Sequence, residues 1–341
     1  MKIAIYYRSP IAYTHVKPDA SPLPGTETAV LEMAYAFGLL GHEVRLYTHP
    51  DELRSAPRAD IFVVKRNPAI ALLYPAIAPR VFFWSPDLRT ELSFVPLSAP
   101  GTLRRFISGV YRVIAISEFQ AGQYRQLGIP KSKIIVSRNG VRSELYQGKT
   151  KKNPGACLYV SGHGDGLEYL SGIWEQIHAR VPGSTLTVIA SRSLYREAVS
   201  KQTKRILSDL KKRSGVTVAP LLPRKDLAKT MLRSAVLLYP NTELETSCMT
   251  VIEARVAGAV IVTSARGALP ETARGNILIS GTPKSAVYRK KFINAAVDML
   301  EHPAKRAQIG RQNRRSLSHY NWITIAREWE SVFSEAAHTT I

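Results

Sequence analysis

Short runs of apolar residues alternate with longer helix-like segments along almost the whole chain. A helix expected at 27–40 ends at Gly41, in the usual C-cap position, and Ser117 is placed to cap a helix that runs to Leu127. In the first half of the chain, strands are expected at 3–7, 44–48, 61–64, 81–84 and 112–117. Buried strands that alternate with helices form a parallel sheet covered on both faces. The sequence therefore predicts an α/β fold.

A polar segment with Gly and Pro at 147–155 interrupts this alternation and has nothing to bury, which is typical of a domain linker. The alternation then restarts with a helix at 167–181. The strands expected in this half cover 157–161, 186–190, 216–219, 236–239 and 260–263. A chain of 341 residues is long enough for two domains that each bury a core. We therefore expect two Rossmann-like domains, at 1–146 and 154–317.

The net charge of +21 is high and is spread over the whole chain. The first 150 residues hold 19 Lys and Arg against 11 Asp and Glu, and the remainder holds 28 against 15. Such a field favours nucleic acid, an anionic membrane surface or phosphorylated substrates, although it also serves plain solubility. Nucleic acid is not expected as a partner, because no helix-turn-helix, zinc-finger or RNA-recognition pattern occurs. The basic run at 201–213 is expected to be a solvated helix face.

Several patterns that would define a compartment or a cofactor are missing. No run approaches the ~20 apolar residues that a membrane-spanning helix needs. Cys157 and Cys248 form neither a disulfide framework nor a zinc-ligand spacing, so we expect a reducing, cytoplasmic location, with peripheral attachment to the inner face of a membrane as an option. No Asp-x-Asp triplet or His/Asp cluster offers ligands for a divalent cation, so no metal is expected. The absence of a Walker loop, and of Gly-x-Gly-x-x-Gly after the first strand, argues against phosphoryl transfer and dinucleotide chemistry.

The segment at 239–254 carries the strongest functional signal. It reads as the end of a strand, a short loop and a helix that starts near Cys248. Glu245 in the loop and Glu253 about two turns into the helix can accept hydrogen bonds from sugar and ribose hydroxyls. Neither is expected in the core, so their replacement should leave thermal stability intact. A helix start presents free N–H groups and a positive dipole end, which suit a diphosphate. The residues expected to bind it are Thr246, Ser247, Cys248, Met249 and Thr250.

This segment and the residues after it resemble the donor-site signature of retaining family-four glycosyltransferases. The pattern consists of Glu245, seven residues and then Glu253, followed by Ala-Arg-Val-Ala-Gly at 254–258 and Gly-Ala-Leu-Pro-Glu at 267–271. The resemblance covers nearly the whole chain. Further similar stretches follow the order of the family and lie at 24–28, 41–44, 116–119, 139–141, 161–170 and 320–322, before Trp329.

This resemblance implies the GT-B fold, in which the parallel sheets of two Rossmann-like domains face an interdomain cleft. The first domain would bind the acceptor, the second would bind the nucleotide-sugar, and the segment at about 318–341 would pack back on the first. The implied reaction moves a sugar from a UDP-, GDP- or ADP-sugar to a hydroxyl of a sugar- or lipid-linked acceptor, with retention of anomeric configuration and without a cofactor.

The resemblance also implies roles for single residues. Glu245 would contact the transferred sugar, and Glu253 would fix the ribose. Gly25 would let the first loop approach the donor closely, because a side chain there would clash. We add Asp87 as a catalytic candidate beside Glu245 and Gly25, and Gly162 as a donor-binding candidate.

Three features depart from the family pattern. His163 and Asp165 occupy the loop where the family commonly has Arg and Lys against the donor diphosphate, and Pro86 stands where many members have a His near the sugar. Gly25 alone remains of the paired glycines in the first loop. Neither His163 nor Asp165 is an obvious substitute, so the candidates for the missing charge are Arg192, Arg224 and Lys225, and His163 is kept as a donor-binding candidate. These departures leave two alternatives open: a silent module that binds nucleotide-sugar or glycan, and a sugar-nucleotide epimerase of the same fold.

Overall fold

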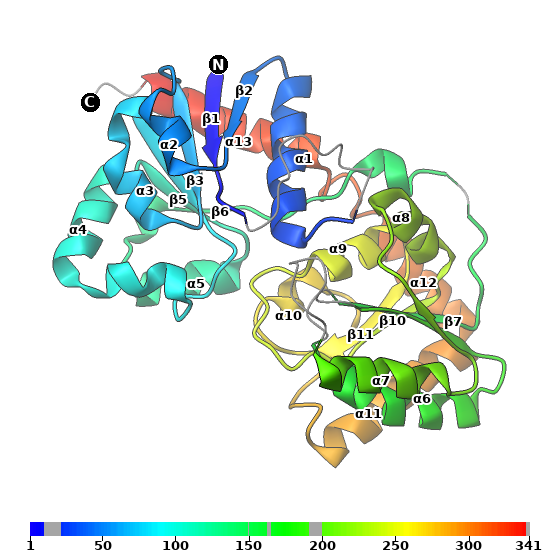
Figure 1. Ribbon diagram of the computed structural model, residues 1–341. Coiled ribbons are helices and arrows are strands. Elements are labelled where there is room, and N and C mark those ends of the chain that lie inside the picture. Colours follow the sequence, from blue (N-terminus) through cyan, green and yellow to red (C-terminus); the bar gives the residue numbers. More distant parts are fainter. Residues whose placement is uncertain (10–21, 149, 162–164, 191–199, 339–341) are drawn as a thin grey trace. The chain divides into compact units, whose positions relative to one another are not determined.

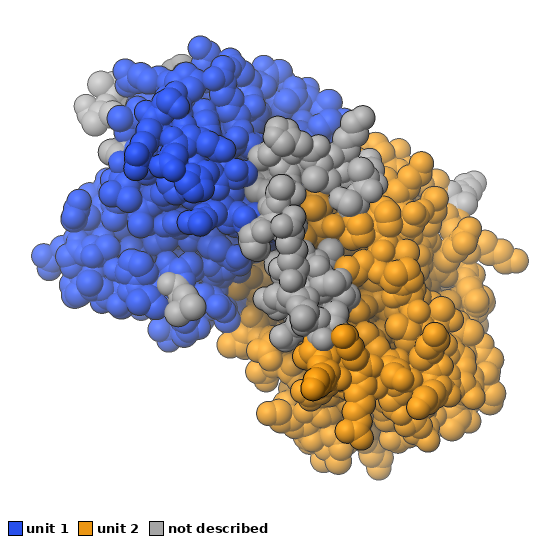
Figure 2. All heavy atoms as spheres, viewed as in Figure 1, with its two compact units in different colours: residues 1–16, 25–140, 321–341 blue, residues 17–24, 141–320 orange. Residues whose placement is uncertain are grey.

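The computed structural model describes residues 1–9, 22–148, 150–161, 165–190 and 200–338. The chain divides into two compact units, the first containing 1–16, 25–140 and 321–341 and the second 17–24 and 141–320 (Figure 2). The second unit begins before the polar 147–155 segment because 141–146 already belongs to its structure. The N–H of Val141 donates to the carbonyl of Tyr320 at 2.6 Å, and Tyr146 is part of the core of this unit.

The first unit is built on a six-stranded parallel sheet of order β2-β1-β3-β4-β5-β6 with flanking helices (Figure 1). Its strands are β1 (Lys2–Tyr6), β2 (Glu43–Tyr47), β3 (Ile61–Lys65), β4 (Arg80–Trp84), β5 (Arg112–Ala115) and β6 (Ile134–Val136). Its helices are α1 (Gly25–Leu39), α2 (Pro50–Arg54), α3 (Pro68–Leu73), α4 (Pro100–Gly109), α5 (Glu118–Gln126) and α13 (Trp322–His338), with short 3-10 turns at Pro75–Ile77, Leu92–Ser98 and Lys131–Lys133. As expected, the Ser117 side chain caps α5 by accepting from the N–H of Gln120.

The C-terminal helix α13 completes the core of this first unit. The ring of Trp329 packs edge-on against Trp84 of β4, with 5.1 Å between ring centroids, and its Nε1–H donates to Ser137 Oγ at 2.7 Å. Every residue of β3 and of β4 is buried, because helices cover these central strands. Gly140 makes room for α13, since a Cβ there would lie 2.7 Å from the ring of Trp322.

The second unit repeats the architecture with a six-stranded parallel sheet of order β12-β11-β10-β7-β8-β9. Its strands are β7 (Ala156–Ser161), β8 (Thr185–Ala190), β9 (Val216–Ala219), β10 (Val236–Tyr239), β11 (Val260–Ser264) and β12 (Ile277–Ile279). Its helices are α6 (Leu167–Arg180), α7 (Lys201–Lys211), α8 (Arg224–Arg233), α9 (Met249–Val256), α10 (Leu269–Thr272), α11 (Ala286–Glu301) and α12 (Pro303–Arg314), and a 3-10 turn lies at Ser143–Tyr146.

Helix α7 presents its basic side chains to solvent. Lys201, Lys204, Arg205 and Lys211 are exposed, whereas Leu210 is fully buried against the sheet. The expectation of a solvated basic helix face is therefore confirmed for 201–211, whereas Arg213 lies beyond the helix, is partly exposed and forms ion pairs with Glu175 and Asp209. In the described part of the chain, no helix combines the length and the apolar character needed to cross a membrane.

Candidate functional site

In the second unit, helices α6 and α9 begin at the point where the order of the strands in the sheet reverses. From β7 the chain proceeds outward through β8 and β9, and it then returns to the other side of β7 to form β10, β11 and β12. In open α/β sheets, ligands bind outside the carboxyl ends of the strands at such a switch point. Helices α6 and α9 follow β7 and β10, so both begin at this edge. The first N–H groups of each helix have no partner within the helix and can face a ligand.

Two glycines bring the loops of this edge into contact. Gly166, at φ 77°, precedes α6, and a Cβ on it would lie 1.8 Å from the carbonyl oxygen of Pro240. Gly267, at φ 54°, follows β11, and its Cβ would lie 2.3 Å from the carbonyl oxygen of Glu245. The next residue, Ala268, donates its N–H to that same oxygen at 2.7 Å. Only glycine permits these approaches, so the loop that carries Glu245 is held between the start of α6 and the loop after β11.

The carboxylate of Glu245 is held in a defined position by neighbouring donors. Its Oε1 accepts from the Tyr239 hydroxyl at 2.7 Å and from Asn241 Nδ2 at 3.1 Å. Burial raises the pKa of Glu245 to about 7, although the Tyr239 hydrogen bond acts in the opposite direction. This carboxyl group therefore changes charge close to neutral pH. Sequence reasoning missed Tyr239 and Asn241, although both lie at the strand end directly before Glu245.

Glu253 differs from the expectation that it lies outside the core. It is 3% exposed and forms an ion pair with Arg224, whose side chain is 13% exposed. Burial raises the pKa of Glu253, while Arg224 and a hydrogen bond with Tyr146 lower it. Glu253 is buried because Arg224 and Tyr146 contact it from segments that are distant in sequence. Arg224 is thus committed to this carboxylate in the structure.

The remaining predicted donor residues occupy different environments. Ser247 is 4% exposed, and its Oγ is buried without a hydrogen-bond partner among the described residues. Cys248 is the N-cap of α9, and burial raises the pKa of its thiol well above the usual value, so this thiol stays protonated. Thr246, Met249 and Thr250 flank it at the same edge and are partly exposed, whereas Lys225 is exposed in the first turn of α8. Gly162, His163 and Arg192 lie outside the described residues.

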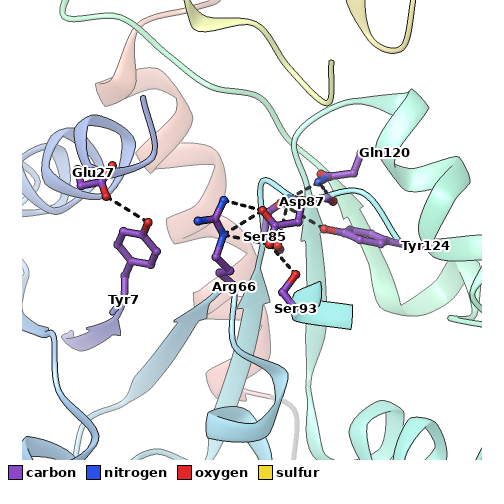
Figure 3. Close-up of polar contacts among 8 residues, drawn as sticks. All are labelled: Tyr7, Glu27, Arg66, Ser85, Asp87, Ser93, Gln120 and Tyr124. Carbon is purple, nitrogen blue, oxygen red and sulfur yellow. Dashed lines mark hydrogen bonds and ion pairs between the residues drawn. The ribbon is translucent and has the colours of Figure 1, made fainter. Parts of the chain in front are cut away.

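The first unit has a switch point of its own between β1 and β3, and polar side chains gather at its carboxyl edge (Figure 3). Glu27, in the first turn of α1, is fully buried and accepts hydrogen bonds from Tyr7 at 3.2 Å and from Ser9 at 2.5 Å. The other carboxylate oxygen of Glu27 is buried and makes no hydrogen bond within the described residues. Gly25, the first residue of α1, is exposed.

Lys65 ends β3 at this edge and Arg66 follows it directly, and the two side chains lie in different environments. Lys65 is 1% exposed with its ammonium 3.0 Å from the centroid of the Trp84 ring, and burial lowers its pKa well below the usual value. Arg66 has a left-handed backbone with φ 70°, which no other described non-glycine residue adopts. A bulky side chain rarely tolerates this conformation, and such strain clusters at functional sites.

Asp87 is the centre of the hydrogen bonds drawn in Figure 3. Its Oδ1 accepts from Arg66 Nε at 2.9 Å and from Nη2 at 2.7 Å, and its Oδ2 accepts from Ser93 Oγ at 2.6 Å. Gln120 Nε2 donates to the Asp87 carbonyl at 3.0 Å and to the Ser85 carbonyl at 2.9 Å, which ties the loop after β4 to α5. Asp87 thereby positions Arg66. Its role as a catalytic residue stays a prediction.

Metal-ligating side chains do not cluster in the part of the chain that the structure describes. Among these residues, no group of three or more His, Cys, Asp or Glu side chains could hold a metal ion. The acidic side chains of both edges are instead engaged with tyrosine, serine, asparagine or arginine donors.

No protein-family model matches the sequence, and no curated protein matches it. Solved structures do match. The sucrose-phosphate synthase from Thermosynechococcus elongatus aligns with a TM-score of 0.72 at 15% identity, over 98% of this chain and 99% of that one. HepE from Anabaena in complex with UDP and glucose aligns with a TM-score of 0.73 at 16% identity, over 98% and 100%. WaaG, a glycosyltransferase involved in lipopolysaccharide biosynthesis, aligns with a TM-score of 0.67 at 14% identity, over 97% and 99%. Likeness over the full length at these identities shows the fold, so the chain has the GT-B fold with two parallel six-stranded sheets.

Proposed function

We propose that this protein is a glycosyltransferase that moves a sugar from a nucleotide-sugar, with UDP-, GDP- and ADP-sugars as candidates, to a hydroxyl of a sugar- or lipid-linked acceptor. The observation that carries the proposal is the edge of the second unit, where the held Glu245 carboxylate lies directly before the start of α9. The solved HepE structures with UDP and with UDP-glucose support a donor of this class. The first unit would bind the acceptor, and the reaction would retain the anomeric configuration.

The chemistry asks for charge stabilisation rather than for a nucleophile on the protein. As the bond between the anomeric carbon and the diphosphate breaks, negative charge grows on the departing phosphate, which also takes the acceptor proton. Preorganised N–H groups and cations stabilise that charge, and the first turn of α9 provides such N–H groups. The carboxylate of Glu245 can stabilise the positive charge that develops on the sugar, and Glu253, oriented by Arg224, is proposed to face the ribose.

A thermal-shift screen against UDP-, GDP- and ADP-sugars tests the donor class, because a ligand at a hundred times its Kd stabilises the fold by about 2.7 kcal/mol. Turnover assays with and without acceptor then separate the alternatives. Donor consumption that needs an acceptor supports the transferase. Consumption without acceptor would indicate an epimerase, and binding without any turnover would indicate a silent binding module.

We expect activity to be independent of divalent metal. The described residues offer no group of three His, Cys, Asp or Glu side chains for a metal ion, and we propose that protein cations and N–H groups bind the phosphates instead. Donor turnover should be the same in EDTA and in magnesium or manganese, within about two-fold. Turnover that EDTA abolishes and manganese restores would contradict the proposal.

We also propose that the protein works in the cytoplasm and binds the surface of anionic membranes there. The net charge of +21 and the exposed basic face of α7 motivate this proposal, since each basic residue near such a surface contributes about 1 kcal/mol. In flotation assays, vesicles with phosphatidylserine should carry the protein at low salt and release it as screening increases. Equal binding to neutral vesicles, or no binding to either kind, would refute it.

A further inference from the structure

The proposed function requires positive charge beside the donor diphosphate, and no residue has yet been assigned to supply it. The sequence offers Arg192, Arg224 and Lys225 for this purpose. Arg224 is paired with the buried Glu253, Lys225 is exposed in the first turn of α8, and Arg192 lies outside the described residues. The loop that opens the second domain contributes Asp165, which adds negative charge to the same edge. Within the described residues, a cation for the diphosphate would therefore have to lie at another position.

Arg266 has the properties of such a cation. It lies in the loop between β11 and α10, at the carboxyl end of the strand next to β10. Its side chain is partly buried, and its Nε is buried without a hydrogen-bond partner among the described residues. None of the described carboxylates forms an ion pair with it. A buried guanidinium nitrogen without a partner is costly, so it marks a place where a ligand is expected.

The surroundings of Arg266 connect it to the start of α9. The next residues, Gly267 and Ala268, contact Glu245, whose carbonyl accepts the Ala268 N–H at 2.7 Å. Two residues after Glu245, Ser247 has a hydroxyl that is also buried and has no hydrogen-bond partner among the residues that the structure describes. The two adjoining loops therefore each carry an unsatisfied buried donor at the edge where α9 begins. A guanidinium N–H and a hydroxyl are both chemically suited to phosphate oxygens.

We infer that Arg266 and Ser247 bind the diphosphate of the donor, together with the first N–H groups of α9. The guanidinium fork matches the oxygens of a phosphate group, and it remains charged at every pH of interest. In this arrangement the charge that neutralises the diphosphate comes from the loop after β11, whereas in the resembling family it comes from the loop that opens the second domain. The inference rests on the proposed function and assigns Arg266 a binding role that the sequence motif does not include.

The test is Arg266→Gln, with Arg274→Gln as its matched control. Arg274 is exposed and lies between α10 and β12, which places it near the opposite, amino edge of the sheet, and its replacement removes the same charge from the same unit. Calorimetry would compare UDP, GDP and ADP with the corresponding nucleosides and with inorganic pyrophosphate. For Arg266→Gln we expect a roughly 10- to 100-fold loss of affinity for the preferred nucleoside diphosphate and for pyrophosphate, with nucleoside affinity unchanged.

Further variants separate binding from structure. Arg266→Lys should retain part of the diphosphate affinity, because it keeps the charge but loses the planar fork. Ser247→Ala should weaken diphosphate binding by roughly 3- to 10-fold. Without ligand, the Tm of Arg266→Gln should equal or exceed that of the wild type, since a buried nitrogen without a partner is removed.

Two outcomes would overturn the inference while the proposed function stands. The first is a wild-type protein that binds UDP, GDP or ADP and an Arg266→Gln variant that binds it equally well. The second is a variant with a lowered Tm and equal losses for nucleoside and nucleoside diphosphate, which would indicate a structural role. A wild-type protein that binds none of the three nucleoside diphosphates would instead refute the proposed function, and this inference with it.

Discussion

Replacement of Glu253 by glutamine is expected to destabilise the second unit and to weaken nucleotide binding at the same time. Removal of this carboxylate leaves the largely buried guanidinium of Arg224 without its ion pair, a change that typically costs about 3–5 kcal/mol. At roughly 2–4 °C per kcal/mol for a unit of this size, the Tm should fall by on the order of 10 °C. If Glu253 also holds the ribose, the affinity for free nucleotide should fall by ~1.5–3 kcal/mol, measured by calorimetry below the transition.

The double variant Arg224→Met/Glu253→Met separates these two effects. Replacement of a buried ion pair by apolar residues of similar size is often neutral for stability, so the Tm should return towards that of the wild type. Nucleotide affinity should stay low, because no ribose partner has been restored. A Glu253→Gln variant that keeps both the wild-type Tm and the wild-type affinity would show that the donor site lies elsewhere.

The expectation from sequence that Glu253 lies outside the core is wrong, and the reason lies in tertiary contacts. A glutamate two turns into a helix looks like a surface residue when only its neighbours in sequence are considered. Its burial depends on Arg224 in α8 and on Tyr146 in the 3-10 turn at Ser143–Tyr146, and no sequence pattern predicts that these distant residues meet Glu253. Local patterns do predict the helix start at Cys248, because that signal is contained in adjacent residues.

The same distinction applies to the fold: elements defined by adjacent residues can be predicted from sequence, and features that depend on distant contacts cannot. The strands at 216–219 and 236–239 occur with the predicted bounds, since each is a short run of apolar or β-branched residues that ends directly before a proline. The edge strands β6 and β12 have three residues each and were not predicted, because a run of three residues is too short to show the alternation of apolar and polar residues that indicates a strand. The importance of Gly166 and Gly267 also depends on the structure, since their requirement comes from the carbonyls of Pro240 and Glu245.

Glu245 offers the sharpest test of catalysis, because its charge changes in the range where enzymes are assayed. Its pKa is raised by burial to about 7 from an ordinary value of 4.5, so protonation is favoured in the folded state. Its contribution to stability is therefore complete below pH 4.5 and is lost as the pH rises through about 7. The stability of the wild type relative to Glu245→Gln should thus decrease between pH 5 and pH 8, as urea unfolding at both values would show.

Catalysis should have the opposite pH dependence from stability. The ionised carboxylate is the form that stabilises positive charge on the sugar, so kcat of the wild type should rise with an apparent pKa near 7. Glu245→Gln cannot ionise, so its kcat should be about 10²-fold lower and should lose this rise, with nucleotide affinity nearly unchanged. Glu243→Gln is the matched control, because Glu243 is an exposed carboxylate two residues away, and its kcat should stay within about two-fold of the wild type. If Glu245→Gln keeps the pH profile of the wild type, the titrating group is another residue and Glu245 does not contact the reacting sugar.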